Sequence, residues 1–126
     1  MTYRLETAGA APIEAGLRPI GWIEVRPDDV VILHHSVLSV DALNAAVAGD
    51  FEQAPPLDTP DAMFIPSVKA GRSYNRIATT LVSRSLMPGD KIGGTVVIVG
   101  PPDEVGDPTS YTPEVEQAIM ALHPRQ

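Results

Sequence analysis

A cluster of basic side chains in the second half of the chain has the residue types that bind anions. Between residues 69 and 91 five basic side chains stand against one acidic side chain, although the whole chain has a net charge of −7. Part of this segment is a glycine-containing loop before an expected helix, where free backbone N–H groups and the helix dipole favour phosphate or carboxylate. An arginine in the helix would add charge-assisted hydrogen bonds, and a tyrosine in the loop would stack on a nucleobase. The residues that we predict to form this anionic-ligand site are Lys69, Arg72, Tyr74 and Arg76, with Arg84 as an outer contact.

The same residues also have a purely structural interpretation. In that interpretation the Lys and Arg side chains solvate the exposed face of a surface helix, and Asn75 is the residue that caps it. The segment is not a known phosphate loop, because neither G-x-x-x-x-G-K-[ST] nor G-x-G-x-x-G occurs in the chain. Both interpretations stay open at the level of the sequence.

Two adjacent histidines, His34 and His35, are the candidates for acid–base chemistry. They end an apolar run that is typical of a strand, in which neighbouring side chains point to opposite faces and so cannot chelate one metal ion together. We expect one histidine to be buried and hydrogen-bonded and the other to lie near the end of the sheet. No partner for a catalytic base follows at local spacing, and the chain has no cysteine to serve as nucleophile or thiolate ligand. We therefore predict no catalytic residues, no metal site and no cofactor, and we keep a small hydrolase based on His34 or His35 as an alternative.

Two other short stretches have functional interpretations that compete with structural ones. The acidic loop Asp103–Asp107 offers carboxylates to a hard cation, but it lacks the ligand spacing of a calcium loop, so we expect a solvated turn. The pair Gly93–Gly94 would let a ligand approach the backbone, and a bulge or a tight crossing of two segments explains it equally well.

Composition limits the class of protein. The chain has 126 residues, which is the size of one domain with a proper core, and we expect residues 20–126 to form it after a flexible N-terminal arm at residues 1–19. No apolar run approaches the ~20 residues that cross a bilayer, and the start of the chain lacks the pattern of a signal peptide. A pI near 4.7 argues against bulk nucleic-acid or membrane binding. We expect a cytoplasmic location.

The elements that must position these residues follow from periodicity and capping signals. Expected strands are Ile20–Val25, Val30–His35, Phe51–Leu57 (kept to a sheet edge, or ended early, by Pro55 and Pro56), Ala62–Pro66 and Ile92–Val99. Expected helices run from a Ser39 cap to Gly49, from about Asn75 to Leu86, and from a Thr112 cap to His123. The order β-β-α-β-β-α-β-α predicts an α+β fold, a small mixed sheet with about three helices mainly on one face.

Several short motifs are spread over residues 28–121: L-N-A-A-V-A-G-D-F-E (Leu43–Glu52), P-L (Pro56–Leu57), N-R-I-A-T-T-L (Asn75–Leu81), G-T-V-V-I-V-G (Gly94–Gly100) and D-E-V-G-D (Asp103–Asp107). Together they resemble a family of small domains of unknown function that is found in bacteriophages, actinobacteria and other bacteria. The resemblance implies a small stand-alone accessory protein, commonly encoded by a phage or mobile element, and it brings no agreed catalytic residues. Short phage accessory proteins often inhibit host defence, which is an argument by analogy.

Three hypotheses about function follow, and the first is the one we favour from the sequence. The protein would bind and sequester a small anionic, nucleotide-like ligand without catalysis and thereby counter host defence signalling in the host cytoplasm. Because the basic loop alone offers few contacts, we expect a homo-oligomer that shares the site. The second hypothesis is an acidic protein–protein inhibitor of a host enzyme, and the third is the histidine-based hydrolase.

Overall fold

The structure is a computed structural model that describes residues 2–3 and 18–123. Its elements in chain order are β1 (Thr2–Tyr3), β2 (Ile20–Val25), β3 (Val31–Ser36), α1 (Val40–Val47), β4 (Phe51–Gln53), β5 (Ala62–Pro66), α2 (Arg76–Leu81), the 3₁₀ turn η1 (Ser83–Ser85), β6 (Val96–Val99) and α3 (Pro113–Leu122). The predicted α+β class is confirmed, and the order from β2 onward is the predicted one. The predicted arm at residues 1–19 lies mostly outside the described residues.

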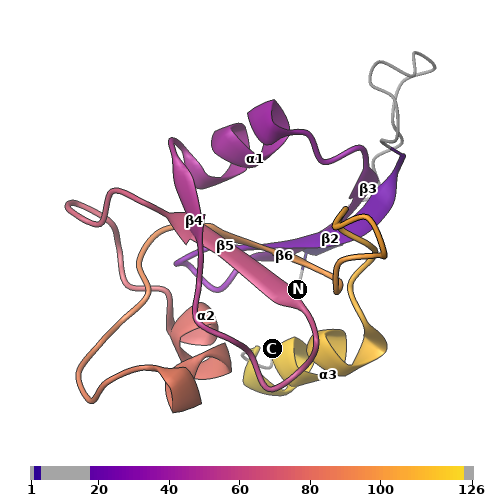
Figure 1. Cartoon of the computed structure of the whole chain (residues 1–126). Helices are drawn as coiled ribbons and strands as arrows, with labels where there is room; N and C mark the ends of the chain where they lie inside the picture. Colours follow the sequence, from indigo (N-terminus) through magenta and orange to yellow (C-terminus); the bar gives the residue numbers. More distant parts are fainter. Residues whose placement is uncertain (1, 4–17, 124–126) are drawn as a thin grey trace.

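All six strands form one mixed sheet in the order β1-β3-β2-β6-β5-β4 (Figure 1). The short β1 pairs with β3 in parallel, and every other neighbouring pair is antiparallel. The strand β4 lies at an edge and ends at Gln53, as the prolines that follow it predict, because proline cannot donate to a sheet ladder.

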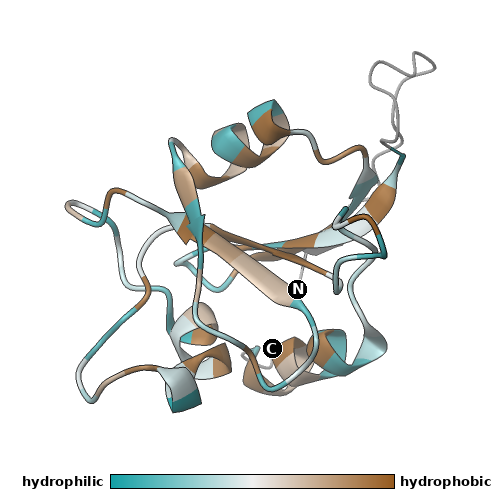
Figure 2. Cartoon of the chain, viewed as in Figure 1, coloured by the Kyte–Doolittle hydropathy of each residue, from teal (hydrophilic) through white to brown (hydrophobic). Residues whose placement is uncertain are grey.

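Helices cover both faces of this sheet, so the domain has three layers (Figure 1). Trp22 of β2 and Val97 of β6 pack in the core cluster beneath α1, whereas Ile23 and Ile98, their chain neighbours, pack in the cluster beneath α2 and α3. Burial on both faces explains why β6 is hydrophobic along its length (Figure 2). Two helices share a face as expected, but α1 lies on the opposite face. None of the described helices has the length and apolar character that a bilayer crossing needs.

The predicted helix starts are confirmed by side-chain caps. Ser39 Oγ accepts from the backbone N–H of Ala42, Asn75 Oδ1 accepts from Ala78, and Thr112 Oγ1 accepts from Val115. At the end of α1 the left-handed residue is Ala48, with φ 60°, rather than the predicted Gly49.

Besides β4, two elements are shorter than their sequence patterns predict. The helix α2 ends at Leu81 and gives way to η1, because the hydroxyls of Thr79 and Thr80 bond carbonyls four residues back, which weakens a helix. The strand β6 begins only at Val96, because Gly94 has φ +81° and the preceding residues pair with another segment of the chain.

Candidate functional site

All three nitrogens of the Arg72 guanidinium donate hydrogen bonds to backbone carbonyls. Its two terminal nitrogens donate to the carbonyls of Val47 and Ala48 at 3.1 Å each, and its Nε donates to Val68 at 3.1 Å. The first two carbonyls belong to the C-terminal end of α1, whose own last turn has no basic residue. Arg72 therefore supplies from a distant loop the cation that stabilises the negative end of this helix.

Arg76 does the same for α3 on the opposite face of the sheet. Its guanidinium donates to the carbonyl of Leu122 at 2.7 Å and to Asp29 Oδ1 at 3.3 Å. The last turn of α3 also lacks a basic residue. Since Arg72 and Arg76 bind helix ends on different faces, the two central arginines of the predicted anionic-ligand site do not converge.

The other three predicted site residues lie on the surface with partners of their own. Lys69 Nζ donates to the carbonyl of Pro66 at 2.9 Å and pairs with Glu52 at 3.2 Å. Arg84 pairs with Asp58 at 3.7 Å, and both side chains are largely exposed. Tyr74 is half-exposed, and Lys91 Nζ lies 5.4 Å from its ring centroid. The structure thus brings Tyr74 next to Lys91, which was not in the predicted set.

Asn75, predicted only as a helix cap, joins three segments of the chain. It is fully buried, and besides capping α2 its Nδ2 donates to the carbonyls of Val25 at 3.0 Å and Gly94 at 2.8 Å. Ser73–Asn75 runs alongside Ile92–Gly94, and a Cβ on Gly94 would lie 2.9 Å from Pro66 Cγ. The paired glycines therefore permit a tight crossing of two segments of this chain.

As expected, one histidine of the pair, His34, is buried, and the other, His35, lies near the end of β3, where it is exposed. The His34 ring stacks on Trp22 at a centroid distance of 3.8 Å, and its Nε2 lies 2.9 Å from Glu24 Oε1. Burial by itself raises the pKa of the Glu24 carboxyl, but hydrogen bonds to His34 and Arg26 outweigh this and hold the pKa below its ordinary value. The side chains of His34 and Glu24 are only 5% and 12% exposed, which fits a structural role.

The acidic loop binds its own backbone. Asp103 Oδ1 accepts hydrogen bonds from the N–H groups of Val105 at 3.0 Å and Asp107 at 2.9 Å. Across residues 18–123, no three His, Asp or Glu side chains come together in a metal-binding arrangement. The geometry of the loop is that of the expected turn.

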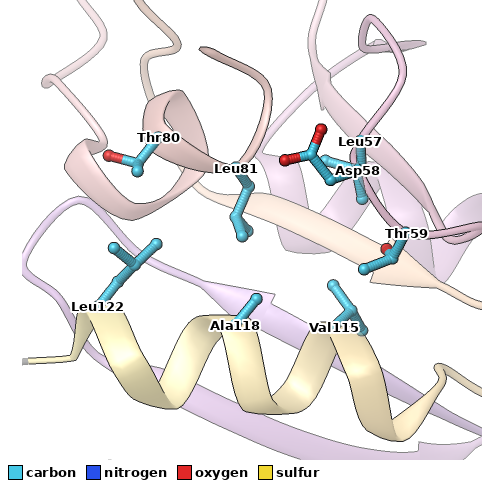
Figure 3. A pocket seen from close by; sticks show the side chains of 8 residues that line it. All are labelled: Leu57, Asp58, Thr59, Thr80, Leu81, Val115, Ala118 and Leu122. Atoms are coloured by element: carbon cyan, nitrogen blue, oxygen red, sulfur yellow. The ribbon is translucent and has the colours of Figure 1, made fainter. Parts of the chain in front are cut away.

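A groove between α2 and α3 is the feature that the sequence did not indicate. It has a volume of about 210 Å³ and is lined mainly by apolar side chains (Figure 3). Its walls come from the loop after β4, from α2 and from α3, and the side chains are Leu57, Asp58, Thr59, Thr80, Leu81, Val115, Ala118 and Leu122. In the sequence the α3 residues have the spacing of a buried helix face. Ala118 is a small side chain on that face, and it was the one indication that a hollow could form there.

Polar contacts around the groove fix the positions of its walls. At one end Arg76 ties the start of α2 to the Leu122 carbonyl of α3. The hydroxyl of Ser85 donates to the carbonyl of Pro56 at 3.0 Å, which fixes the loop wall. At the other end both oxygens of the buried Asp61 accept from Thr112, at 2.8 and 2.6 Å. A hollow in an apolar region costs free energy unless it collapses, and these ties oppose its collapse.

One polar atom beside the groove lacks a hydrogen-bond partner. Thr59 Oγ1 is buried and makes no hydrogen bond, whereas Thr80 Oγ1 donates to the carbonyl of Arg76 at 2.9 Å. An unpaired buried hydroxyl is uncommon in folded proteins and calls for an explanation.

Comparisons with family models, with curated proteins and with solved structures return no match to this chain. The resemblance to the family of small phage and actinobacterial domains therefore stays a prediction.

Proposed function

We propose that this protein is a non-catalytic, protein-binding protein that takes one aromatic side chain of a basic partner into the groove between α2 and α3. The observation that carries the proposal is a pre-formed apolar hollow whose walls are fixed by polar contacts. Pre-formed apolar hollows with a few polar groups at the rim are the usual form of binding sites.

The size of the groove favours a single side chain over a whole small molecule. Sites for cofactors and drug-sized ligands measure roughly 300–1,000 Å³, and this groove has about 210 Å³. An engineered apolar cavity of about 150 Å³ accepts benzene. One aromatic ring therefore fits, and the rest of the ligand must lie on the protein surface outside the groove.

Charge favours a basic partner. The chain carries −7 overall, and Asp58 lies at the rim of the groove. Its pair with Arg84 joins two exposed side chains at 3.7 Å, and exposed pairs of this kind contribute little. A lysine of the partner can therefore take the place of Arg84, and the net charge would speed encounter with a basic surface. This role corresponds to the second hypothesis from the sequence, the acidic inhibitor of a host enzyme, and inhibition of a host defence protein is the biological form that we propose for it.

Toluene, which has the ring of a phenylalanine side chain, is the simplest probe of the groove. We expect it to raise the melting temperature of the native protein in a saturable way. Ala118→Leu fills the hollow and removes the effect, whereas Ala121→Leu, on the exposed side of α3, keeps it. Absence of any response in the native protein, or an undiminished response in the filled variant, would refute the groove as a site.

The charge of the partner is tested with tripeptides that carry tyrosine between two lysines or between two glutamates. We expect the lysine peptide to bind more tightly, and added salt to weaken its binding by screening. The Asp58→Asn variant should reduce the difference between the two peptides. Equal binding of both peptides would exclude the basic partner.

A second candidate keeps the anionic, nucleotide-like ligand that the sequence favours, at a smaller site. The observation in its favour is the half-exposed Tyr74 ring with Lys91 close to it, a pair that suits a base and a phosphate. Titration with mono-, di- and cyclic nucleotides tests it. Binding that is lost in Tyr74→Ala and Lys91→Ala, and kept in Lys69→Ala, would favour this candidate.

A further inference from the structure

We infer that the groove selects a hydroxylated aromatic ring, the side chain of tyrosine, over the plain ring of phenylalanine, and that Thr59 is the residue that makes the selection. The inference rests on the proposed function, because it names the group that the groove receives. It starts from the unpaired Thr59 hydroxyl and from the position of this residue in the groove wall.

Thr59 differs from the other polar residues of the groove. The Thr80 hydroxyl is bonded to the Arg76 carbonyl, and the Asp58 carboxylate is paired with Arg84. Of the three polar side chains in the lining, Thr59 is thus the one that makes neither a hydrogen bond nor an ion pair. Figure 3 shows it at the same end of the groove as Val115, so a ring that enters along α3 would point its far edge toward Thr59.

The geometry of threonine allows the hydroxyl to reach a ligand. Its hydroxyl and methyl groups occupy two staggered positions on the same Cβ, and one rotation about χ1 exchanges them. In the free protein the hydroxyl gains nothing from its present position, since it has no partner there. A ring with a phenolic O–H supplies both a donor and an acceptor to a hydroxyl that has turned into the groove.

The selection follows from the difference between paired and unpaired buried groups. A plain ring leaves the Thr59 hydroxyl without a partner, as it is in the free protein. A phenolic ring satisfies the hydroxyl and has its own O–H satisfied at the same time. Sites with a buried hydrogen-bonding group discriminate in this way against analogues that lack the matching group.

The test compares p-cresol with p-xylene, which have the same shape and differ in an O–H against a methyl group. We expect the native protein to prefer p-cresol, and Thr59→Val to lower the ratio of the two affinities on the order of fivefold. Thr59→Ser keeps the hydroxyl and should keep the preference. Thr80→Val removes a hydroxyl that is already bonded and should leave the ratio unchanged.

Each outcome either supports or refutes the selection of a phenolic ring by Thr59. If both probes bind and the ratio is the same in the native protein and in Thr59→Val, the inference is wrong while the groove remains a site. If neither probe binds, the proposed function fails and the inference fails with it. A drop in the ratio that is confined to Thr59→Val supports both.

Discussion

Residue types suggest that the basic segment Lys69–Arg76 binds a ligand and that the residues between α2 and α3 form closed core. The contacts in the structure favour the reverse. The segment is rich in groups that bind ligands, yet its two central arginines are bound to carbonyls at the ends of α1 and α3. The groove is built from residues typical of a core, yet it is open and has an unpaired hydroxyl beside it. Availability of a group for a ligand therefore depends on the partners that the fold gives it.

The comparison has a simple physical basis. A charged group near a protein surface gains by binding carbonyls at a helix C-terminus, and it loses that gain if a ligand takes it away. An apolar groove that is open to water and a hydroxyl without a hydrogen bond, in contrast, both raise the free energy of the free protein. A ligand that fills the groove and forms a hydrogen bond with the hydroxyl recovers that free energy on binding.

Asn75→Ala is expected to have the largest effect on folding. It removes the donors to the Val25 and Gly94 carbonyls and the cap of α2, all in a fully buried position. We expect the free energy of unfolding to fall by about 3–4 kcal/mol, as measured by urea denaturation.

The matched control is Asn44→Ala, because Asn44 lies within α1, where alanine is the better helix former. We expect that variant to unfold at nearly the native urea concentration. Equal effects of the two substitutions would contradict the central structural role of Asn75.

Arg72→Ala separates the two interpretations of the basic segment. Loss of the three hydrogen bonds to the carbonyls of Val47, Ala48 and Val68 should cost about 2 kcal/mol. Arg84→Ala makes the same change in charge at an exposed ion pair and should cost less than about 0.5 kcal/mol. If both variants keep native stability, Arg72 is free for another role and the comparison fails.

Much of the fold was predictable because it depends on local signals. The strand at Ile20–Val25 and the three side-chain caps were predicted from periodicity and from polar residues at helix starts. The histidine pair was predictable too, since alternation in a strand places His34 and His35 on opposite faces.

The candidate site was not predictable, because it depends on contacts between segments far apart in the chain. Arg72 acts on Val47 and Ala48, more than twenty residues earlier, and nothing local to either segment indicates the contact. The groove likewise depends on hydrogen bonds of Arg76 and Asp61 that join segments far apart in the chain. The sequence therefore shows which groups are present, while their availability is decided by tertiary structure.

Glu24→Gln tests the buried cluster beside Trp22 through its pH dependence. The pKa of Glu24 lies below its ordinary value of 4.5, so its ionised form stabilises the fold above that pH and the contribution disappears as the pH falls through the lowered pKa. We expect the variant to be about 1–2 kcal/mol less stable at pH 7. The difference should shrink below pH 4.5, and a difference that is constant with pH would contradict the account.

Thr59→Val should have the smallest effect on the free energy of unfolding, and it should raise that free energy where the other variants lower it. Replacing an unpaired buried hydroxyl with a methyl group removes a desolvation cost, so the free protein should gain up to about 1 kcal/mol. Thermal unfolding of the two proteins without ligand measures it. A loss of stability would mean that the hydroxyl has a partner in solution.

The most direct test of the central claim is a methyl and amide NMR titration with the tripeptide that carries tyrosine between two lysines. The account predicts saturable shifts at Leu81, Val115 and Leu122 around the groove, and their loss in Ala118→Leu. Shifts confined to Arg72 and Tyr74, or shifts at the groove that persist in the filled variant, would contradict it.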